Sequence, residues 1–341
     1  MTGLVAKACF WTAAGLLSYA YLVYPALVLA AARFRRISKE IPVGESWPQV
    51  AIVIAAYNEE KHIEARIRNL LGQDYPPERL TVYIGSDGST DATAQVAASV
   101  ADQRTVIRDY VPNRGKASVL NDLVGQATQE VIVFSDANTR FENDTVARLV
   151  AAFADPGVGA VCGELILTPP DQAGNQDHEY WSLERGLKAA ESSIDGLLGA
   201  NGGVYAIRRA LYQPLRPDTI CDDFLIVMNI AVAGQRVIYE PRARAHEETP
   251  GDMGAEFKRR VRIGIGNYQS LFRHPAFLIS TNVARRWTYV SHKLLRWMTP
   301  HLLIIMLLAS CVAAAQPPYA LLLAMQLAAY AAAWTIYATR Q

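Results

Sequence analysis

The sequence predicts an α/β protein with an open, mixed but mainly parallel sheet, helices on both sheet faces, and flanking transmembrane and interfacial helices. Three observations predict it. Short Val- and Ile-rich runs alternate with helical stretches between residues 50 and 134, as in βαβ units. Acidic side chains follow several of these runs. Segments without charged side chains, long enough to cross a bilayer, stand near both ends of the chain.

Composition narrows the possible functions. The chain has 341 residues, of which 33 are basic and 32 acidic, and its net charge is +1. This balance gives no overall attraction to nucleic acid, so we expect no nucleic-acid partner. The four cysteines show no CxxC spacing, which argues against a disulfide framework or a zinc site. The absence of GxxxxGKS/T, of GxGxxG after a strand and of HExxH argues against a P-loop ATPase, a dehydrogenase and a zinc protease.

The N-terminal segment is predicted to span a membrane once. Residues 8–32 contain no charged side chain, and a helix of that length, at about 1.5 Å per residue, crosses a hydrocarbon core of about 30 Å. The run is too long for a signal-peptide core, and no small-residue cleavage pattern follows it. We assign residues 1–36 to a transmembrane helix and residues 37–49 to a polar linker.

The C-terminal end has the same character. No Asp, Glu, Lys or Arg occurs from Trp297 to Thr339, and Pro317-Pro318 divides this run, because proline ends one helix and can open the next. We predict two spans joined by a tight outer loop within residues 298–341. The basic clusters near the spans then lie on the side of the central domain, which predicts that this domain is cytoplasmic.

Residues 50–250 are predicted to form the central domain. The expected strands are 50–54, 81–85, 105–108 and 131–134, and the expected helices lie near 59–73, 91–101 and 116–127. Such sheets bind ligands beyond the carboxyl ends of their strands. Tyr57-Asn58-Glu59, Asp87 and Asp136 fall at such ends, so we expect them to share one cleft.

Asp136 and Asn138 follow the run 131–134 and are the candidate metal ligands. Residues i and i+2 of an extended segment point the same way, so both side chains can reach one ion. Carboxylate and amide oxygens suit Mg²⁺ or Mn²⁺, which can neutralise the charge on a departing diphosphate. An ordinary strand-end turn, where Asp and Asn are common, is the alternative explanation.

Residues in three further segments can hold a nucleotide. Asp87 can bond a ribose or a base edge, with a plain Asx turn as the alternative. Tyr57 can cover a uracil and Glu59 can accept from ribose hydroxyls, although acidic residues are common in a first helical turn. Lys116 begins a predicted helix, where a cation suits a bound phosphate better than it suits the helix dipole.

Asp222 and Asp223 precede a helix predicted at 224–233. One carboxylate is explained as the helix N-cap, and capping needs only one. The other can be the general base that takes the proton from an acceptor hydroxyl. We assign that role to Asp223.

Residues 251–297 are assigned to basic and amphipathic interface helices. The run 258–262 is explained either as a solvated charged face or as an arginine clamp on the departing diphosphate. Residues 285–297 place aromatic and basic side chains on different faces, which is typical of a helix in the membrane interface. His246 is a further candidate metal ligand, with a structural role as the alternative.

Together these residues resemble the family 2 glycosyltransferases, and most of all the membrane-embedded branch that holds hyaluronan, chitin, cellulose and poly-N-acetylglucosamine synthases. The matching motifs follow the family order and are specific jointly rather than singly. They are Ala56-Tyr57-Asn58-Glu59, Ser86-Asp87-Gly88-Ser89-Thr90-Asp91, Asn113-Arg114-Gly115-Lys116, Ser135-Asp136-Ala137-Asn138, Gly199-Ala200-Asn201-Gly202-Gly203, Asp222-Asp223 and Arg259–Ile263.

The resemblance implies a GT-A fold and inverting transfer of a sugar from a nucleotide-sugar donor, usually UDP-linked, to a saccharide or lipid-linked acceptor. It also implies Mg²⁺ or Mn²⁺ and a lipid bilayer, expected to be a bacterial inner or plasma membrane. The implied roles are nucleotide binding by Ala56, Tyr57, Glu59, Asp87 and Lys116, metal binding by Asp136 and Asn138, catalysis by Asp223 and Arg262, and acceptor binding by Asn201, Gly202, Gly203, Tyr205 and Asp222.

The chain departs from the family pattern at two motifs. The second Asp of the family's DxD motif is Asn138 here, which we expect to weaken metal binding without abolishing it. The family's QxxRW motif is matched by Arg259–Ile263, which keeps Arg262 but lacks the Gln and the Trp. In the synthases that Trp lines the acceptor terminus, so processive polymerisation and single addition both stay open.

Other functions stay open as well. The chain can be a transferase that adds one sugar to a lipid-linked acceptor, a catalytically silent nucleotide-sugar sensor or scaffold, or a nucleotidyltransferase. The joint presence of Asp136, Asp223 and Arg262 favours a catalyst over a scaffold, and the missing Gly-rich phosphate loop disfavours a nucleotidyltransferase. Three predicted spans are few for a pore in one chain, so self-association or a partner subunit is also considered.

Overall fold

The computed structural model describes residues 2–34, 47–168, 175–248, 253–279 and 282–339. In these ranges one eight-stranded sheet has the strand order β3-β2-β1-β4-β7-β6-β8-β5. The strands are β1 (Val50–Ala56), β2 (Leu80–Asp87), β3 (Thr105–Tyr110), β4 (Val131–Phe134), β5 (Thr139–Phe141), β6 (Val158–Thr168), β7 (Tyr205–Arg208) and β8 (Arg236–Glu248). Most of the predicted linker 37–49 lies outside the described residues.

The sheet has a parallel half and a mixed half. β3, β2, β1 and β4 are parallel neighbours, as the sequence predicts. β7 runs antiparallel to β4 and β6, whereas β6 pairs in parallel with β8, and β5 closes the edge antiparallel to β8. Four of the seven strand pairs are therefore parallel, which confirms a mixed, mainly parallel sheet. The strand order reverses between β1 and β4, and such a switch point opens a crevice at the carboxyl ends of the strands.

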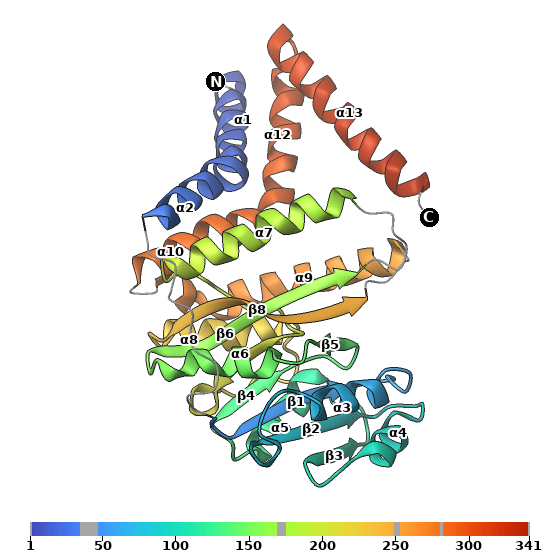
Figure 1. Cartoon of the computed structure of the whole chain (residues 1–341). Helices are drawn as coiled ribbons and strands as arrows, with labels where there is room; N and C mark the ends of the chain where they lie inside the picture. The colour runs from blue at the N-terminus through green and yellow to red at the C-terminus, as the bar shows by residue number, and fades with distance from the viewer. Residues whose placement is uncertain (1, 35–46, 169–174, 249–252, 280–281, 340–341) are drawn as a thin grey trace.

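Helices cover both faces of this sheet (Figure 1). They include α3 (Ile63–Leu71), α4 (Thr93–Val100), α5 (Lys116–Gln126), α6 (Thr145–Ala151), α7 (Asn175–Ser193), α8 (Asp222–Val232) and α9 (Met253–Arg273). Alternate residues of β1 reach opposite layers: Ala51 and Val53 join the core cluster containing α5 and α8, and Ile52 and Ile54 join the one containing α3 and α6. Burial on both faces explains why β1 is apolar throughout.

The first apolar segment is not one straight helix. A π-helical turn at Tyr19–Val23 separates α1 (Thr2–Ser18), which packs on α12 (Thr299–Ala313), from α2 (Tyr24–Arg33), which packs on α7. Tyr24 is fully buried, and its hydroxyl donates to Glu191 Oε1 at 2.7 Å. The second half of the first apolar segment, helix α2, is therefore anchored to the central domain.

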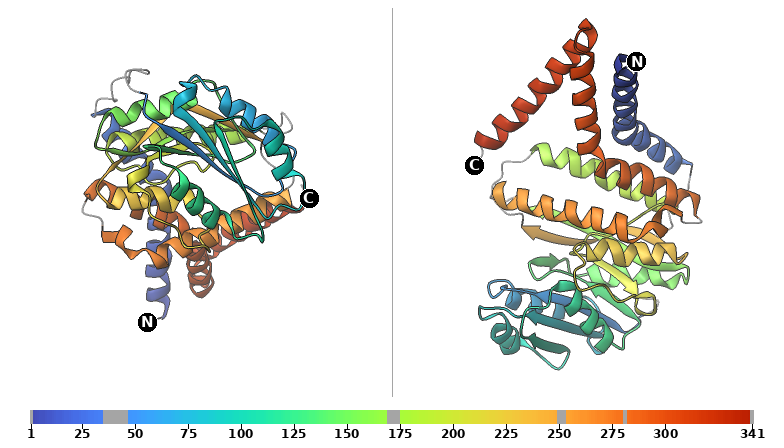
Figure 2. Two further views of the ribbon diagram at one scale, coloured as in Figure 1. Left: turned by 90° about the horizontal axis from the view of Figure 1, so that it is seen from below. Right: turned by 180° about the vertical axis from the view of Figure 1, so that it is seen from behind.

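In the described part of the chain, two helices are long and apolar enough to cross a membrane. They comprise residues 3–33 and α13 (Pro317–Thr339). A third candidate is a bent pair, in which Val283–Trp297 and α12 meet at 58°. Figure 2 shows α1, α12 and α13 projecting from the same end of the molecule.

The sequence pattern of residues 285–297 predicts a helix with separate aromatic and basic faces. The structure does not show that separation. It consists of α10 (Val283–Thr288), a π-helical turn (Tyr289–Leu294) and α11 (Leu295–Trp297). Trp287 Nε1 donates to the Tyr19 hydroxyl at 2.8 Å, and Arg296 pairs with Glu184 at 2.6 Å. Trp287 and Arg296 thus both contact other parts of the protein, and the segment lies between α7 and the terminal helices (Figure 1).

Candidate active site

Lys116 brings two carboxylates together at the carboxyl ends of the central strands. Its Nζ atom lies 2.9 Å from Asp136 Oδ1 and 3.4 Å from Asp222 Oδ2. Asp136 follows β4, Lys116 opens α5 and Asp222 opens α8. Burial by itself would raise the pKa of Asp136, but the cations of Lys116, Arg66 and Arg262 together hold that pKa below its usual range. The three elements thus deliver an ionised carboxylate and a cation to one place.

Asp223 faces the same space from the other side of Gly202. A Cβ atom placed on Gly202 would lie 3.3 Å from Asp223 Oδ2 and 3.8 Å from Asp136 Oδ2. The structure therefore brings together Asp136 and Asp223, which stand far apart in the sequence. A side chain at position 202 would fill the space between the two carboxylates, so glycine keeps it open for a ligand.

The carboxyl group of Asp223 has a pKa raised to about 6. Burial is the largest cause, and repulsion by Asp222 adds to it, while the ammonium group of Lys116 acts in the opposite direction. Such a group is ionised at pH 7 yet binds a proton more tightly than an ordinary aspartate. These are the properties of a general base.

The N-terminus of α8 differs from the prediction. Cys221 occupies the N-cap position and makes no side-chain capping bond, and both aspartates lie in the first helical turn. Asp223 Oδ1 accepts from the backbone N–H of Phe224 at 2.8 Å. Neither aspartate is the N-cap, so capping does not explain this acidic pair, although two carboxylates suit the helix dipole.

Asp87 holds the loop that carries Lys116. Its carboxylate is buried, and the two oxygens accept from the backbone N–H groups of Arg114 and Gly115, each at 2.8 Å. Gly115 adopts a φ of +86°, which favours glycine. The structure gives this carboxylate a positioning role, whereas its contact with a nucleoside stays a prediction.

The loop after β1 is bonded to the loop after β2. Asn58, at a φ of +56°, accepts from the backbone N–H of Thr90 at 2.8 Å, and the Glu59 N–H donates to Thr93 Oγ1 at 2.8 Å. Tyr57, which follows the buried Ala56, has 52% of its surface exposed and is free to stack on a base. The loops thus form a fixed frame around one exposed aromatic ring.

The candidate metal ligands are hard oxygen donors with few protein partners. Asn138 is exposed, and its Nδ2 atom donates to Glu247 Oε1 at 3.5 Å, so a third oxygen-bearing side chain lies beside it. Among the described residues, no three His, Cys, Asp or Glu side chains gather closely enough to hold a metal ion. Ala137 and Asn138 form a turn rather than extended backbone, so strand geometry does not align the two side chains as the sequence predicts. Asp136 and Asn138 stay candidate ligands for an ion that would take its other ligands from phosphate and water, as Mg²⁺ commonly does.

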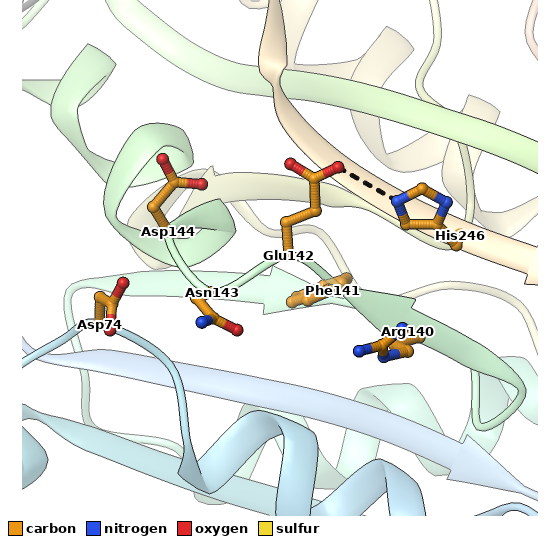
Figure 3. A pocket seen from close by; sticks show the side chains of 7 residues that line it. All are labelled: Asp74, Arg140, Phe141, Glu142, Asn143, Asp144 and His246. Atoms are coloured by element: carbon orange, nitrogen blue, oxygen red, sulfur yellow. Dashed lines mark hydrogen bonds and ion pairs between the residues drawn. The ribbon is translucent and has the colours of Figure 1, made fainter.

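His246 belongs to a different pocket. It lies in β8 directly before Glu247, and its Nε2 atom is 3.1 Å from Glu142 Oε1 (Figure 3). That pocket is lined by Asp74, Arg140, Phe141, Glu142, Asn143, Asp144 and His246. Successive strand residues point to opposite faces, so His246 cannot share an ion with the side chain of Glu247. The structural role is the one the structure shows.

Arg66 is a buried cation that the sequence analysis missed. It lies in α3 with 2% of its surface exposed, and it donates to Ser135 Oγ at 2.5 Å, while Ser135 Oγ donates to the Gly203 carbonyl at 2.7 Å. Its guanidinium also contributes to the low pKa of Asp136. Arg66 thus links the Asp136 turn to the glycine loop. An arginine inside an otherwise ordinary amphipathic helix gives no local signal of this role.

The loop 199–203 borders the site and is held in place by hydrogen bonds. The amide of Asn201 is fully engaged: its Oδ1 accepts from Lys188 Nζ at 2.6 Å and its Nδ2 donates to the Gly163 carbonyl at 2.8 Å. Gly203 is buried, and a Cβ there would lie 2.9 Å from Thr139 Oγ1. Gly202 is the residue of this loop that borders the space between the carboxylates.

Tyr205 does not line an acceptor site, contrary to the prediction. It is fully buried, and its ring stacks on Phe134 with centroids 4.8 Å apart. Burial raises the pKa of its hydroxyl, and the charges of Asp222 and Asp223 raise it further. The hydroxyl has no hydrogen-bond partner among the described residues. Tyr205 is therefore a core residue that lies next to the acidic pair.

Arg262 reaches the site from α9. Its side chain is exposed, and its charge helps to lower the pKa of Asp136. Within the described ranges no hydrogen bond or ion pair is found for its guanidinium. The arrangement leaves this cation available for a ligand bound at Asp136.

Comparisons with known proteins agree with this architecture. The profile of the family Glycosyl transferase family 2 matches residues 51–214. Poly-beta-1,6-N-acetyl-D-glucosamine synthase of Staphylococcus aureus (strain COL) is 30% identical over 232 residues, which cover 66% of this chain and 56% of the relative. The chain thus spans little more than half the length of the curated relatives it matches.

Two solved structures share the fold. Mannosyltransferase PcManGT from Pyrobaculum calidifontis, in complex with GDP-Man and Mn²⁺, matches with a TM-score of 0.72 and 26% identity over 99% of this chain and 94% of that chain. TarS 1–349 from S. aureus matches with a TM-score of 0.52 and 15% identity over 77% of this chain and 82% of that chain. The predicted GT-A architecture is confirmed.

Proposed function

We propose, on the premise that residues 51–214 form a glycosyl transferase family 2 domain, that the chain is a membrane-anchored inverting glycosyltransferase. It moves a sugar from a nucleotide-sugar donor to a saccharide or lipid-linked acceptor. The observation that carries the proposal is the convergence of Asp136 and Asp223 on one space beside Lys116. That space offers cations for a leaving diphosphate and a base for an attacking hydroxyl.

Asp223 is the proposed general base. It takes the proton of the acceptor hydroxyl as the hydroxyl oxygen bonds to the anomeric carbon. The bond between that carbon and the diphosphate oxygen breaks on the opposite face, so the anomeric configuration inverts. Lys116 and Arg262 stabilise the negative charge that develops on the diphosphate. Because Asp223 is half-buried beside Asp222, it holds a proton well enough to act at neutral pH.

Asp136 and Asn138 are the proposed ligands of Mg²⁺ or Mn²⁺. When bound, the cation supplies additional positive charge at the diphosphate. The mannosyltransferase neighbour carries Mn²⁺, which supports a divalent ion in this fold. Replacement of the second DxD carboxylate by Asn138 predicts weaker affinity for the metal than in relatives that keep it.

The donor is proposed to be UDP-linked, with Tyr57 stacking on the base and Glu59 and Asp87 near the ribose. The S. aureus relative is named for poly-N-acetyl-D-glucosamine, and the mannosyltransferase neighbour binds GDP-Man. UDP-N-acetylglucosamine and GDP-mannose are therefore the first two donors to compare. Product length separates polymer synthesis from the addition of one sugar.

The terminal apolar helices are proposed to anchor the protein in a bacterial inner or plasma membrane, with residues 50–250 on the cytoplasmic side. The excess of basic residues on that side supports this orientation. Self-association or a partner subunit would complete a channel if the product is a polymer. Labelling of single cysteines from either side of sealed vesicles tests the orientation.

Release of free nucleotide tests the activity. We expect the full chain, in detergent or nanodiscs, to release UDP or GDP from one donor of a nucleotide-sugar panel when Mg²⁺ or Mn²⁺ is present. Asp223→Asn should lower transfer by about 10³-fold and leave donor affinity unchanged. Asp102→Asn, at an exposed turn before β3, is the matched control. Equal transfer by wild type and Asp223→Asn, with donor bound by both, would instead support a silent sensor or scaffold.

A further inference from the structure

Two lysines lie between the loop 199–203 and the terminal helices, and neither forms an ion pair with a described residue. Lys188, in α7, donates to Asn201 Oδ1 at 2.6 Å and has no carboxylate within ion-pair distance in the described ranges. Lys293, in the π-helical turn before α11, makes no hydrogen bond or ion pair with any described residue. Its Nζ atom lies 5.9 Å from the centre of the Phe224 ring. Both side chains are half-buried.

The two carboxylates whose charges act on Lys293 are engaged elsewhere. Glu184 pairs with Arg296 at 2.6 Å, and Glu191 accepts from the Tyr24 hydroxyl at 2.7 Å and contacts His292 Nδ1 at 2.5 Å. Lys293 is attracted by both glutamates but repelled by Lys188 and Arg296. A partly desolvated ammonium group without an ion-pair partner costs free energy, and an anion bound beside it lowers that cost.

Both lysines lie beside residues that adjoin Gly202 and Asp223 in the sequence. Asn201, the partner of Lys188, directly precedes Gly202, which borders Asp223, and Phe224, beneath Lys293, directly follows Asp223. Lys116 and Arg262, by contrast, act on Asp136. α7 and α10 lie between the sheet and the terminal helices in both side views (Figures 1 and 2). An anion at the two lysines would therefore sit near the base and close to the proposed membrane surface.

We propose that Lys188 and Lys293 bind a phosphate group carried by the acceptor. The inference rests on the proposed function and names the chemical class of its second substrate. A phosphate ester supplies the negative charge that both lysines lack, and lysine binds phosphate as a compact point charge. A lipid phosphate and a soluble sugar phosphate share this chemistry, whereas a neutral saccharide does not.

Direct binding tests the site without requiring turnover. The full chain in nanodiscs of neutral phosphatidylcholine is titrated with a long-chain isoprenyl phosphate, with a soluble hexose phosphate and with inorganic phosphate. We expect at least one phosphate to bind, and Lys188→Met and Lys293→Met each to weaken it by about tenfold. Lys293→Arg should restore most of the affinity because it keeps the charge. Lys61→Met, an exposed lysine elsewhere, should change nothing.

The three phosphates separate the sources. Binding of the isoprenyl phosphate alone identifies a lipid acceptor, and binding of the hexose phosphate with similar affinity identifies a soluble one. The proposal is overturned if no phosphate binds, or if Lys188→Met and Lys293→Met bind phosphate as wild type does while remaining folded by circular dichroism. A neutral glycan acceptor whose KM is unchanged in both variants would also overturn it.

The assays also distinguish this proposal from the proposed function. Donor-dependent nucleotide release by the wild type, measured without added acceptor, tests the proposed function separately from phosphate binding. Nucleotide release with no phosphate binding refutes the acceptor site alone. Phosphate binding without nucleotide release from any donor refutes the transferase and leaves an anion site.

Discussion

The two sides of the site are built differently. On the proposed donor side, the loops after β1 and β2 bond to each other, and both oxygens of Asp87 accept backbone N–H groups. On the proposed acceptor side, α7, α8 and the segment 285–297 bring charged groups that are incompletely paired: Asp223 beside Asp222, and Lys188 near Lys293. The proposed donor side is thus held in place by hydrogen bonds between its own loops, whereas the proposed acceptor side contains charges that a bound ligand would balance.

This difference has a mechanistic consequence. A diphosphate and its cation need a fixed frame, because small displacements of a charged group change its interaction energy strongly. A general base needs a perturbed proton affinity, which arises from incomplete pairing and burial. Substitutions on the donor side should therefore act through geometry and donor affinity, and those on the acceptor side through charge and the rate of transfer.

The largest effect is expected at Asp136, where both sides meet. Asp136→Ala removes the proposed metal ligand and the partner of Lys116, so transfer should fall by about 10³-fold or more. Donor affinity and Mn²⁺ affinity should fall together, measured by calorimetry and by electron paramagnetic resonance of Mn²⁺. Asp223→Asn should lower transfer with neither affinity changed. If Asp136→Ala keeps its affinity for Mn²⁺, the metal assignment fails.

A second large effect is expected at Arg66. Arg66→Met keeps the apolar stem but removes the donor to Ser135, so the Asp136 turn and Gly203 lose their common link. We expect kcat/KM to fall by about 10²-fold, in the range that a small misplacement of reacting groups produces. Arg66→Lys should recover part of it. The control is Arg68→Met in the same helix, which loses only an exposed pair with Glu64. Equal behaviour of the Arg66 and Arg68 variants would contradict the prediction.

A smaller effect is expected at Asp87. Asp87→Asn replaces one acceptor oxygen with an NH₂ group that cannot accept from the loop, at a cost of about 1–3 kcal/mol. Donor affinity should weaken by about tenfold while the rate at saturating donor changes little. Asp122→Asn breaks only the exposed pair with the Arg114 side chain and should leave affinity unaltered. A kcat effect without a change in affinity would place Asp87 outside the donor frame.

The smallest effect at neutral pH concerns Asp222. Asp223 must be ionised to accept a proton, and its pKa is raised to about 6, so kcat/KM should fall as the pH drops below about 6. Asp222→Asn removes the repelling charge, which lowers the pKa of Asp223 and moves this acid limb to lower pH. At pH 7 the change should be less than about twofold, because Asp223 is already ionised in both proteins. An acid limb that does not move would assign the titration to another group.

The donor side could be predicted from the sequence to a large extent. β1 to β4 were expected within a few residues of their observed bounds, because their Val- and Ile-rich runs are buried on both faces. Parallel strands direct their carboxyl ends to one edge, so Tyr57, Asp87 and Asp136 follow from strand position alone. β6 and α7 cannot be recognised from local pattern, since β6 contains Gly159, Gly163 and Glu164 and α7 is largely polar.

The sequence by itself determined the parallel half of the sheet, the apolar terminal segments and the identity of the acidic groups, because each of these depends on neighbours within a few residues. The tertiary structure alone decided how the charges are balanced. It paired Lys116 with two acids, buried Arg66 against Ser135, buried Tyr205 in the core and left Lys188 and Lys293 without an ion-pair partner among the described residues. Electrostatic energies depend on distance and on the exclusion of water, and both are set by elements that meet only in the folded chain.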